Sequence, residues 1–265
     1  MAEEGTSSIS PLVVPDLVAF WDFQNPVRGG FRAAGENRYK LRSRPRLPAM
    51  VQTGGLFGPR AVEFKRGTWL ECPRMQCPEL NISGKDAQVT VVAWILWRKK
   101  PRCQFIAGMW DETNRARQYG LFVNLSGRYG SADNVHAHVS ASGGPTDGDA
   151  CCVTYATGAS PLALDRWHTV AMSYDGQHAR AYVDGGLDTN ERRDKRWGLL
   201  NPFSFPDGLH DGGSEGADFT VGAVDTAGKM SNWFHGLMSG LAVYRRALDE
   251  SEIRFLHRAV ENTAT

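Results

Sequence analysis

The stretch spanning residues 166–185 constrains the fold of this chain more than any other. It contains two runs of strand-forming residues, Trp-His-Thr-Val-Ala-Met-Ser-Tyr and His-Ala-Arg-Ala-Tyr-Val, which are connected through Asp175-Gly176. An Asp-Gly pair between two such runs is typical of a tight hairpin turn, because glycine accepts the positive φ that the turn requires. In the second run, small apolar residues alternate with larger or polar ones, which is the two-residue period of a half-buried strand. The stretch therefore predicts an antiparallel hairpin and favours an all-β fold.

Other apolar runs in the chain are short and are separated by glycine, proline and aspartate. Further strands are expected at residues 17–23, 61–64, 68–72, 89–97, 104–110, 118–124, 135–139, 152–155, 218–224 and 236–244. The run 89–97 is β-branched and strongly apolar, which predicts a central strand. Asp249 and Glu252 have capping-box spacing before a narrow apolar stripe, which predicts a short C-terminal helix. Residues 24–59 and 186–217 are rich in turn-forming and charged residues and are expected to be loops.

The length and composition fit one large antiparallel sandwich. The 265 residues are 42% hydrophobic, which is too apolar for a disordered chain. With no internal repeat or clear boundary, residues 16–260 are expected to form one domain after a flexible leader at residues 1–15. A net charge of +1 lacks the basic field of most nucleic-acid binders, so no nucleic-acid partner is expected. No apolar run reaches about 18 residues, so no membrane-spanning helix is expected.

The N-terminus and the cysteines bear on the compartment. The first residues, Met-Ala-Glu-Glu-Gly-Thr-Ser-Ser, lack the basic and apolar regions of a secretory signal, which favours a cytoplasmic location. A leader preceding this sequence would make the protein secreted instead. Five cysteines are an odd number, and the adjacent Cys151 and Cys152 are poorly suited to bridge each other, so free thiols are expected. Cys72 and Cys77 could pair in an exported protein.

Several motifs, in order along the chain, resemble the laminin G-like branch of the concanavalin A-like lectin/glucanase fold. They are the opening strand at residues 17–23, the hairpin at 58–71, the strand at 89–95, the pair at 167–176 and 181–185, and the closing strand and helix at 234–253. The resemblance spans roughly residues 17–258. It implies a two-sheet antiparallel jelly-roll sandwich with a short C-terminal helix. Insertions at 24–59, 111–117, 140–150 and 186–217 exceed the common pattern, and loops on a rigid scaffold are where function is expected.

These motifs specify a fold rather than an activity. The family that they resemble includes carbohydrate-binding modules and adhesion domains and, on the wider fold, glycoside hydrolases and polysaccharide lyases. We therefore expect recognition of a carbohydrate, an acidic polysaccharide or oligosaccharide being the favoured class. A carbohydrate-active enzyme is the first alternative, and a protein-binding adhesion domain that uses its edge strands and long loops is the second. The Glu-x-Asp-x-x-Glu strand of retaining β-glucanases is absent, which removes the usual carboxylates of a hydrolase.

His136 and His138 are the first candidate site residues. Alternation within residues 135–139 puts both imidazoles on one strand face, about 7 Å apart by the rise of a strand. Two imidazoles in this position can donate to sugar hydroxyls, move protons or bind a metal. The structural alternative is a solvated sheet face.

The segment 110–119 is the second candidate. Aromatic faces stack on sugar rings, while arginines and carboxylates hold hydroxyls or acidic groups. The expected ligand-binding residues are Trp110, Asp111, Arg115 and Tyr155. In the enzyme alternative, His136 or His138 acts as the base, Tyr119 or Tyr155 as the acid, and Arg117 neutralises charge. The structural alternative is a polar hairpin loop in which Trp110 and Tyr119 belong to the core.

Two weaker signals concern ions. A basic stretch could hold an anionic polysaccharide or could be a solvated loop; it comprises Arg28, Arg32, Arg38, Lys40, Arg42, Arg44 and Arg46. Proteins of the fold that the chain resembles often hold a structural Ca²⁺. Candidate ligands are Asp22, Asp147, Asp149, Asp218 and Asp225, although no loop has a recognisable calcium pattern. No other cofactor is predicted, and no close set of cysteines and histidines completes a metal site.

Overall fold

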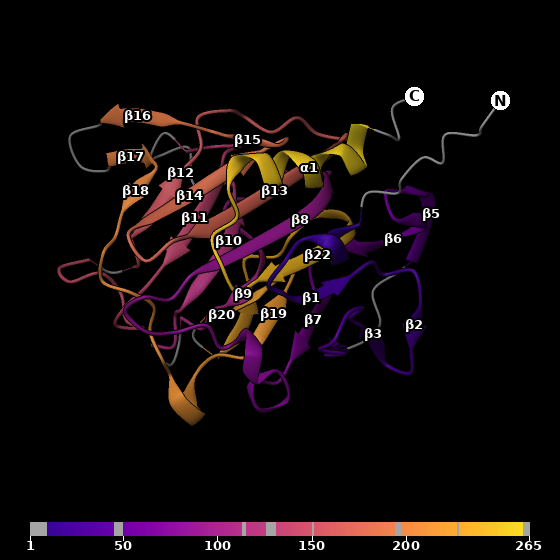
Figure 1. The fold of residues 1–265 in the computed structure, drawn as a ribbon, viewed down its shortest axis with the longest axis horizontal. Coiled ribbons are helices and arrows are strands. Elements are labelled where there is room, and N and C mark those ends of the chain that lie inside the picture. The colour runs from indigo at the N-terminus through magenta and orange to yellow at the C-terminus, as the bar shows by residue number, and fades with distance from the viewer. Residues whose placement is uncertain are drawn as a thin grey trace.

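Two large antiparallel sheets face each other across an apolar core in the computed structural model of the chain (Figure 1). The structure describes residues 10–44, 50–112, 115–125, 131–149, 151–193, 198–226 and 228–261. The predicted all-β sandwich with a C-terminal helix is confirmed.

The first sheet, called sheet A, has the order β15-β14-β13-β8-β22-β6-β5, with β1 paired to β22 and β18 paired to β14. Its strands are β1 (Leu17–Trp21), β5 (Met50–Gly55), β6 (Gly58–Phe64), β8 (Val89–Trp97), β13 (Trp167–Tyr174), β14 (His178–Val183), β15 (Gly186–Leu187), β18 (Phe203–Ser204) and β22 (Gly236–Tyr244). The predicted hairpin is the β13–β14 pair, in which Val170 lies opposite Val183. The apolar run at 89–97 is β8, which lies between β13 and β22 at the centre of the sheet, as its composition predicts.

The second sheet, called sheet B, has the order β12-β11-β10-β9-β19-β7-β4-β3-β2. Its strands are β2 (Pro26–Val27), β3 (Gly30–Arg32), β4 (Lys40–Arg44), β7 (Trp69–Cys72), β9 (Gln104–Met109), β10 (Tyr119–Val123), β11 (Val135–Val139), β12 (Tyr155–Thr157) and β19 (Phe219–Val221). Two small hairpins, β16 (Asn190–Arg193) with β17 (Gly198–Asn201) and β20 (Val224–Thr226) with β21 (Lys229–Ser231), complete the strands.

The inner faces of both sheets are apolar. In sheet B, Leu121, Val135 and Val139 belong to the main buried cluster, together with Val91 and Met172 from sheet A. Because strand side chains alternate, the neighbours of these residues on β10 and β11 point to the outer face of sheet B. That outer face therefore carries the two histidines of β11.

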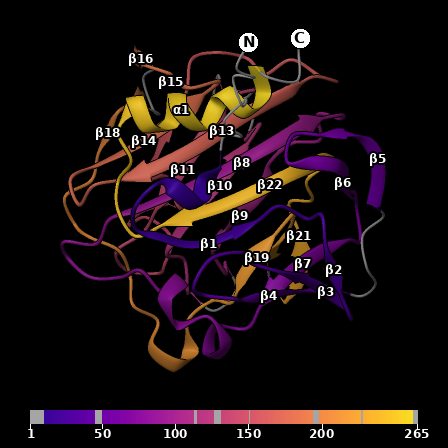
Figure 2. The ribbon, with the colours of Figure 1, turned by 45° about the vertical axis from the view of Figure 1, so that its right-hand side comes forward.

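The outer face of sheet A is covered by α1 (Glu250–Glu261), which crosses β13 and β8 in Figures 1 and 2. Ile253 and Leu256 of the helix join a second buried cluster with Val92 and Trp94. Asp249 caps the helix by accepting a hydrogen bond from the backbone N–H of Glu252 at 2.9 Å, and Glu252 accepts one from the backbone N–H of Asp249 at 3.0 Å. No helix in the described ranges is long and apolar enough to cross a membrane.

The structure differs from the sequence expectation in two segments. Residues 24–59 were expected to be a loop but contain β2, β3, β4 and β5. Residues 186–217 contain the short strands β15 to β18 as well as the short 3₁₀ turn Gly213–Glu215. These strands are two to six residues long and rich in glycine, proline and arginine, so their sequence lacks the apolar alternation that would mark them.

The end of the expected leader is packed against sheet A. Pro11–Val13 form a 3₁₀ turn, and the carbonyl of Pro11 accepts a hydrogen bond from the hydroxyl of Tyr244 at 3.1 Å. Val14 is buried in the same cluster as α1. Two further 3₁₀ turns, Arg74–Gln76 and Pro78–Leu80, follow β7. The remainder of the leader, residues 1–9, lies outside the described residues.

Candidate functional site

The outer face of sheet B carries a continuous row of side-chain positions. In the register of the sheet, Tyr155 lies opposite His138, His138 opposite Gly120, and Gly120 opposite Gly108. A Cβ at Gly120 would lie 2.9 Å from the ring of Phe122 and 3.0 Å from that of Phe105. The glycine therefore lets these two rings lie across the strand beside His138.

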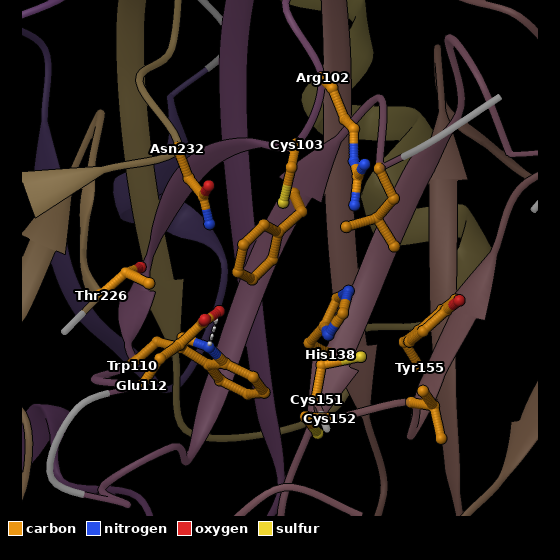
Figure 3. A pocket seen from close by; sticks show the side chains of 13 residues that line it. Arg102, Cys103, Trp110, Glu112, His138, Cys151, Cys152, Tyr155, Thr226 and Asn232 are labelled. Carbon is orange, nitrogen blue, oxygen red and sulfur yellow. Dashed lines mark hydrogen bonds between the residues drawn. The ribbon is translucent and has the colours of Figure 1, made fainter. Parts of the chain in front are cut away.

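A cavity of about 390 Å³ opens on this face (Figure 3). Its floor is formed by sheet residues, and its walls come from five separate segments of the chain. The lining residues are Arg102, Cys103, Trp110, Glu112, Phe122, Leu125, His138, Cys151, Cys152, Val153, Tyr155, Thr226 and Asn232. This size is within the range of small-ligand sites, which are mostly apolar with a few polar groups.

His138 is the central polar group of the cavity. Its ring stacks on that of Tyr155, with centroids 4.5 Å apart and planes at 25°, and it also contacts Phe122 with centroids 4.5 Å apart. The side chain is only 4% exposed, and neither ring nitrogen has a hydrogen-bond partner. Burial, with smaller contributions from His136 and Arg117, holds the pKa of His138 well below its usual range. The ring is therefore neutral, with one donor and one acceptor nitrogen.

His136 lies on the same face but has a different environment. Its ring centroid is 6.5 Å from that of His138, close to the spacing expected from strand geometry. Its Nδ1 pairs with Thr157 Oγ1 at 3.1 Å, and its Nε2 lies 3.3 Å from the carbonyl oxygen of Ser131. Burial lowers its pKa to about 3. His136 does not line the cavity, and both of its nitrogens have partners, so it supports the site rather than contacting a ligand.

Trp110 forms a wall of the cavity. Its ring meets Phe122 and His138 edge-on, with centroids 5.8 Å and 5.4 Å away. Its indole N–H donates to Glu112 at 3.4 Å, which places a carboxylate at the same wall (Figure 3). Asp111, which lies between Trp110 and Glu112 in the sequence, forms a β-bridge with Asp225 and does not line the cavity.

Tyr119 lies on the opposite side of the sheet from the cavity. It pairs with Val139, and its side chain is fully buried in the core between the sheets. Its hydroxyl donates to the carbonyl of Leu80 at 2.7 Å, and burial raises its pKa well above the usual value. The phenol is therefore far from the position that an acid acting with His138 would need.

The two arginines of the segment also differ in position. Arg117 is buried beside the cavity, where its charge acts on His138; its Nη1 donates to the carbonyl of Gly143 at 3.4 Å, and its Nε has no partner. Arg115 is exposed, with its guanidinium against Gly144. Of the eight residues that the sequence suggests for the site, the structure brings Trp110, His138 and Tyr155 together in the cavity.

Most of the other wall residues are not predictable from local sequence. Phe122 could have been found, because period-two alternation places it on the outer face of β10. Thr226 and Asn232 belong to the β20–β21 hairpin and its end, about a hundred residues along the chain from Phe122, and only the tertiary fold brings them to the cavity. Arg102 and Cys103 precede β9, and Cys151 to Val153 precede β12.

The thiols at the cavity are protonated. Burial raises the pKa of Cys103 to about 12 and also raises the pKa of Cys151 and of Cys152. A thiol is a poor nucleophile and a poor metal ligand until it ionises. These side chains therefore act as apolar wall, and all five cysteines are unbridged.

The carboxylates suggested for calcium do not form a cluster in the described part of the chain. Over the described ranges, no group of three or more Asp, Glu, His or Cys side chains is placed to share an ion. The carboxylates of Asp22, Asp218 and Asp225 accept backbone hydrogen bonds from Gln24, Arg74 and Gly228 respectively.

The basic stretch lies at the far end of sheet B. Arg44 pairs with Glu71 at 2.8 Å, Arg42 donates to Gln76, and Lys40 donates to the carbonyl of Arg28. None of these side chains lines the cavity, and Arg46 lies outside the described residues.

Comparison with known proteins agrees with this architecture. Residues 74–254 match the Laminin_G_3 family model, described as the concanavalin A-like lectin/glucanases superfamily, so the chain belongs to this superfamily. No curated protein matches the sequence.

Among solved structures, domain 4 of the extracellular arabinanase AbnA from Geobacillus stearothermophilus, in complex with arabinotriose, is similar with a TM-score of 0.57 at 14% identity. That match covers 91% of this chain and 98% of the domain. The binding domain of Paraclostridial Mosquitocidal Protein 1 matches with a TM-score of 0.55 at 11% identity, covering 91% of this chain and 52% of that one. A Trypanosoma rangeli sialidase in complex with 2,3-difluoro-KDN matches with a TM-score of 0.54 at 14% identity, covering 95% of this chain and 33% of the sialidase. At these identities the likeness shows a shared fold.

Proposed function

We propose that this protein recognises a carbohydrate in the cavity above His138. The observation that carries the proposal is the unpartnered imidazole of His138, buried on an aromatic floor. Leaving a buried polar group without a hydrogen bond costs about 1–3 kcal/mol. Both nitrogens are shielded from solvent in this structure, so the ring must turn toward the cavity to present one of them. A ligand hydroxyl then satisfies that nitrogen, because a hydroxyl both donates and accepts.

The remaining lining fits a sugar. Tyr155, Phe122 and Trp110 give the cavity an apolar lining, of which Tyr155 is the most exposed at 7%. This lining suits the C–H face of a sugar ring, while Glu112, Asn232 and Thr226 supply polar atoms around it. Two of the solved structures similar in fold contain arabinotriose or 2,3-difluoro-KDN, which supports a sugar as the ligand. Arg102 at the wall, with Arg117 beside His138, supports an acidic sugar as the finer proposal.

The test is a binding screen with arabinan, glucan, galactan, polyuronate and sialylated oligosaccharides, read by calorimetry and by tryptophan fluorescence. We expect one of these classes to bind and His138→Phe to weaken it at least tenfold, since about 1.4 kcal/mol corresponds to a factor of ten. The matched control is His178→Phe on β14 of sheet A, which should leave the affinity unchanged. Failure of all five classes to bind the wild-type protein contradicts the proposal.

A lyase acting on uronate polymers is the second candidate, because the structure stacks Tyr155 directly on His138. A neutral imidazole can take a proton, and a phenol can return one to the leaving group. Glu112 is the only carboxylate among the lining residues of the described chain, which disfavours the two-carboxylate mechanism of a hydrolase. Incubation with polyuronates distinguishes the two proposals: a lyase produces unsaturated ends that absorb in the near ultraviolet, and a binding protein does not.

A further inference from the structure

The outer face of sheet B is long enough to hold a polymer. The row that begins at His138 continues through Gly108 and Thr220 to Glu71. It crosses four strand spacings, or about 19 Å. A site for internal segments of a polysaccharide would be an open groove along such a row.

The β20–β21 hairpin interrupts this row. Val224 at its start is buried in one cluster with Phe105 and Trp110, so the hairpin packs onto the outer face of β9. Backbone hydrogen bonds hold it there: Glu112 donates to the carbonyl of Asp225 at 3.0 Å, and Phe105 donates to that of Asn232 at 2.8 Å. The cavity ends at this hairpin, because Thr226 and Asn232 line it.

The wall formed by Cys151, Cys152 and Val153 is also held in place. The backbone N–H of Val153 donates to Thr146 Oγ1 at 2.9 Å, and Thr154 Oγ1 donates to the carbonyl of Val139 at 2.5 Å. Figure 3 shows Cys151 and Cys152 on one side of His138 and Arg102 and Cys103 on the other. Wall residues thus surround the imidazole.

A second aromatic group lies on the same face, beyond the hairpin. Trp69 is two residues before Glu71 on β7 and therefore faces outward, and its ring centroid is 5.7 Å from that of Trp233. Both indoles are partly exposed, and neither lines the cavity. Trp233 follows β21 by two residues, so its contact with Trp69 places the end of the hairpin next to β7. A polymer crossing the face would pass from the cavity over the hairpin to this pair.

We infer that the cavity takes the end of a glycan chain and not an internal segment. The inference rests on the proposed function and specifies its ligand. The walls enclose the unpartnered imidazole on several sides, and the hairpin separates it from the outward tryptophan pair. A terminal sugar enters beside Tyr155, and a hydroxyl of it meets His138 once the imidazole turns toward the cavity, while the rest of the chain leaves toward solvent.

The test uses the sugar class selected in the binding screen, as a series from the monosaccharide to the hexasaccharide. We expect molar affinity to change less than about threefold from the disaccharide to the hexasaccharide. Capping one chain end with a bulky label should abolish binding, and capping the other should not. Trp69→Thr, which keeps a strand-forming residue on β7, should bind the hexasaccharide as the wild type does.

Other results overturn the inference. Affinity that rises with every added sugar, binding that tolerates a label at either end, or a hexasaccharide-specific loss in Trp69→Thr would each show an internal binding mode. In those cases the proposed function survives and the end-recognition is wrong. If the site is right and only the end-recognition is wrong, His138→Phe still loses binding at every chain length. If His138→Phe binds all chain lengths as the wild type does, the site itself is wrong.

Discussion

The two outer faces of this sandwich are both buried and aromatic, yet they are used differently. On sheet A, α1 and the N-terminal turn cover the face, and the indole N–H of Trp94 donates to the carbonyl of Leu256 at 3.2 Å. On sheet B, loops and the β20–β21 hairpin cover part of the face, and His138 is left without a partner. Burial alone therefore does not separate a core from a site.

The difference lies in the polar atoms. A buried polar group that is satisfied within the protein contributes to stability, whereas one that is unsatisfied costs free energy until a ligand satisfies it. Trp94 on the helix face and Tyr244 beneath the N-terminal turn are satisfied by carbonyls of the same chain. His138 is not satisfied, and under the proposed function a ligand provides the missing hydrogen bond on the face of sheet B.

The largest effect on stability is expected on the helix face. Leu256 is fully buried between α1 and sheet A. Leu256→Ala should lower the free energy of unfolding by about 2–5 kcal/mol, because it removes buried methyl groups and leaves a void. Chemical denaturation measures the change, and ligand affinity should be unaffected at temperatures where the variant is folded. A loss of affinity in the folded variant would show that the two faces are coupled.

Acid should destabilise the protein through the face of sheet B. His136 has a pKa of about 3 in the folded chain against 6.5 as its ordinary value, so the unfolded chain binds the additional proton as the pH falls below 6.5. Stability is therefore full above pH 6.5 and declines toward pH 3, by about 1.4 kcal/mol per pH unit for each such histidine. The lowered pKa of His138 likewise makes the free energy of unfolding fall as the pH falls.

Denaturation at pH 7, 6, 5 and 4 measures this dependence. His136→Gln should reduce the slope of the free energy of unfolding against pH by the contribution of about one proton. Thr157→Val provides the matched control, because it removes the hydroxyl that pairs with His136 but leaves the titrating ring in place. An unchanged slope in His136→Gln would contradict the assignment of the acid sensitivity to this ring.

Much of the fold could be predicted because its main strands repeat a local pattern. The run at 89–97 and the strand at 236–244 were predicted with the bounds that β8 and β22 have, since both are long and apolar. The strands between residues 24 and 59 could not be predicted. β2 and β3 are two and three residues long, and β4 presents charged side chains. Pairing rather than local propensity forms them, since β2 pairs with β3, β3 with β4, and β4 with β7.

The site was less predictable because it depends on which face of each strand points outward. Alternation placed His136 and His138 on one face, as the structure shows, but could not show that one ring would be satisfied and the other would not. The enzyme alternative put Arg117 and Tyr119 at one site with the histidines, whereas β10 begins at Tyr119 and directs that ring into the core. The two-residue alternation predicts which face of the sheet a side chain lies on only within a strand, and Arg117 lies before β10 begins.

The smallest effect on stability, and the sharpest test of the comparison, is expected from His138→Phe. The replacement removes two unpartnered nitrogens and keeps a flat ring against Tyr155 and Phe122. Removing an unsatisfied buried polar group is neutral or stabilising, so the free energy of unfolding at pH 7 should change by less than about 1 kcal/mol, toward greater stability. On the helix face, Trp94→Phe also replaces one aromatic ring with another, but it removes the buried hydrogen bond to the carbonyl of Leu256 and leaves a void in the cluster under α1, so it should destabilise by about 1–3 kcal/mol. Denaturation of both variants in parallel measures the contrast. If His138→Phe is as damaging as Trp94→Phe, the imidazole has a structural partner and the two faces do not differ in the way proposed.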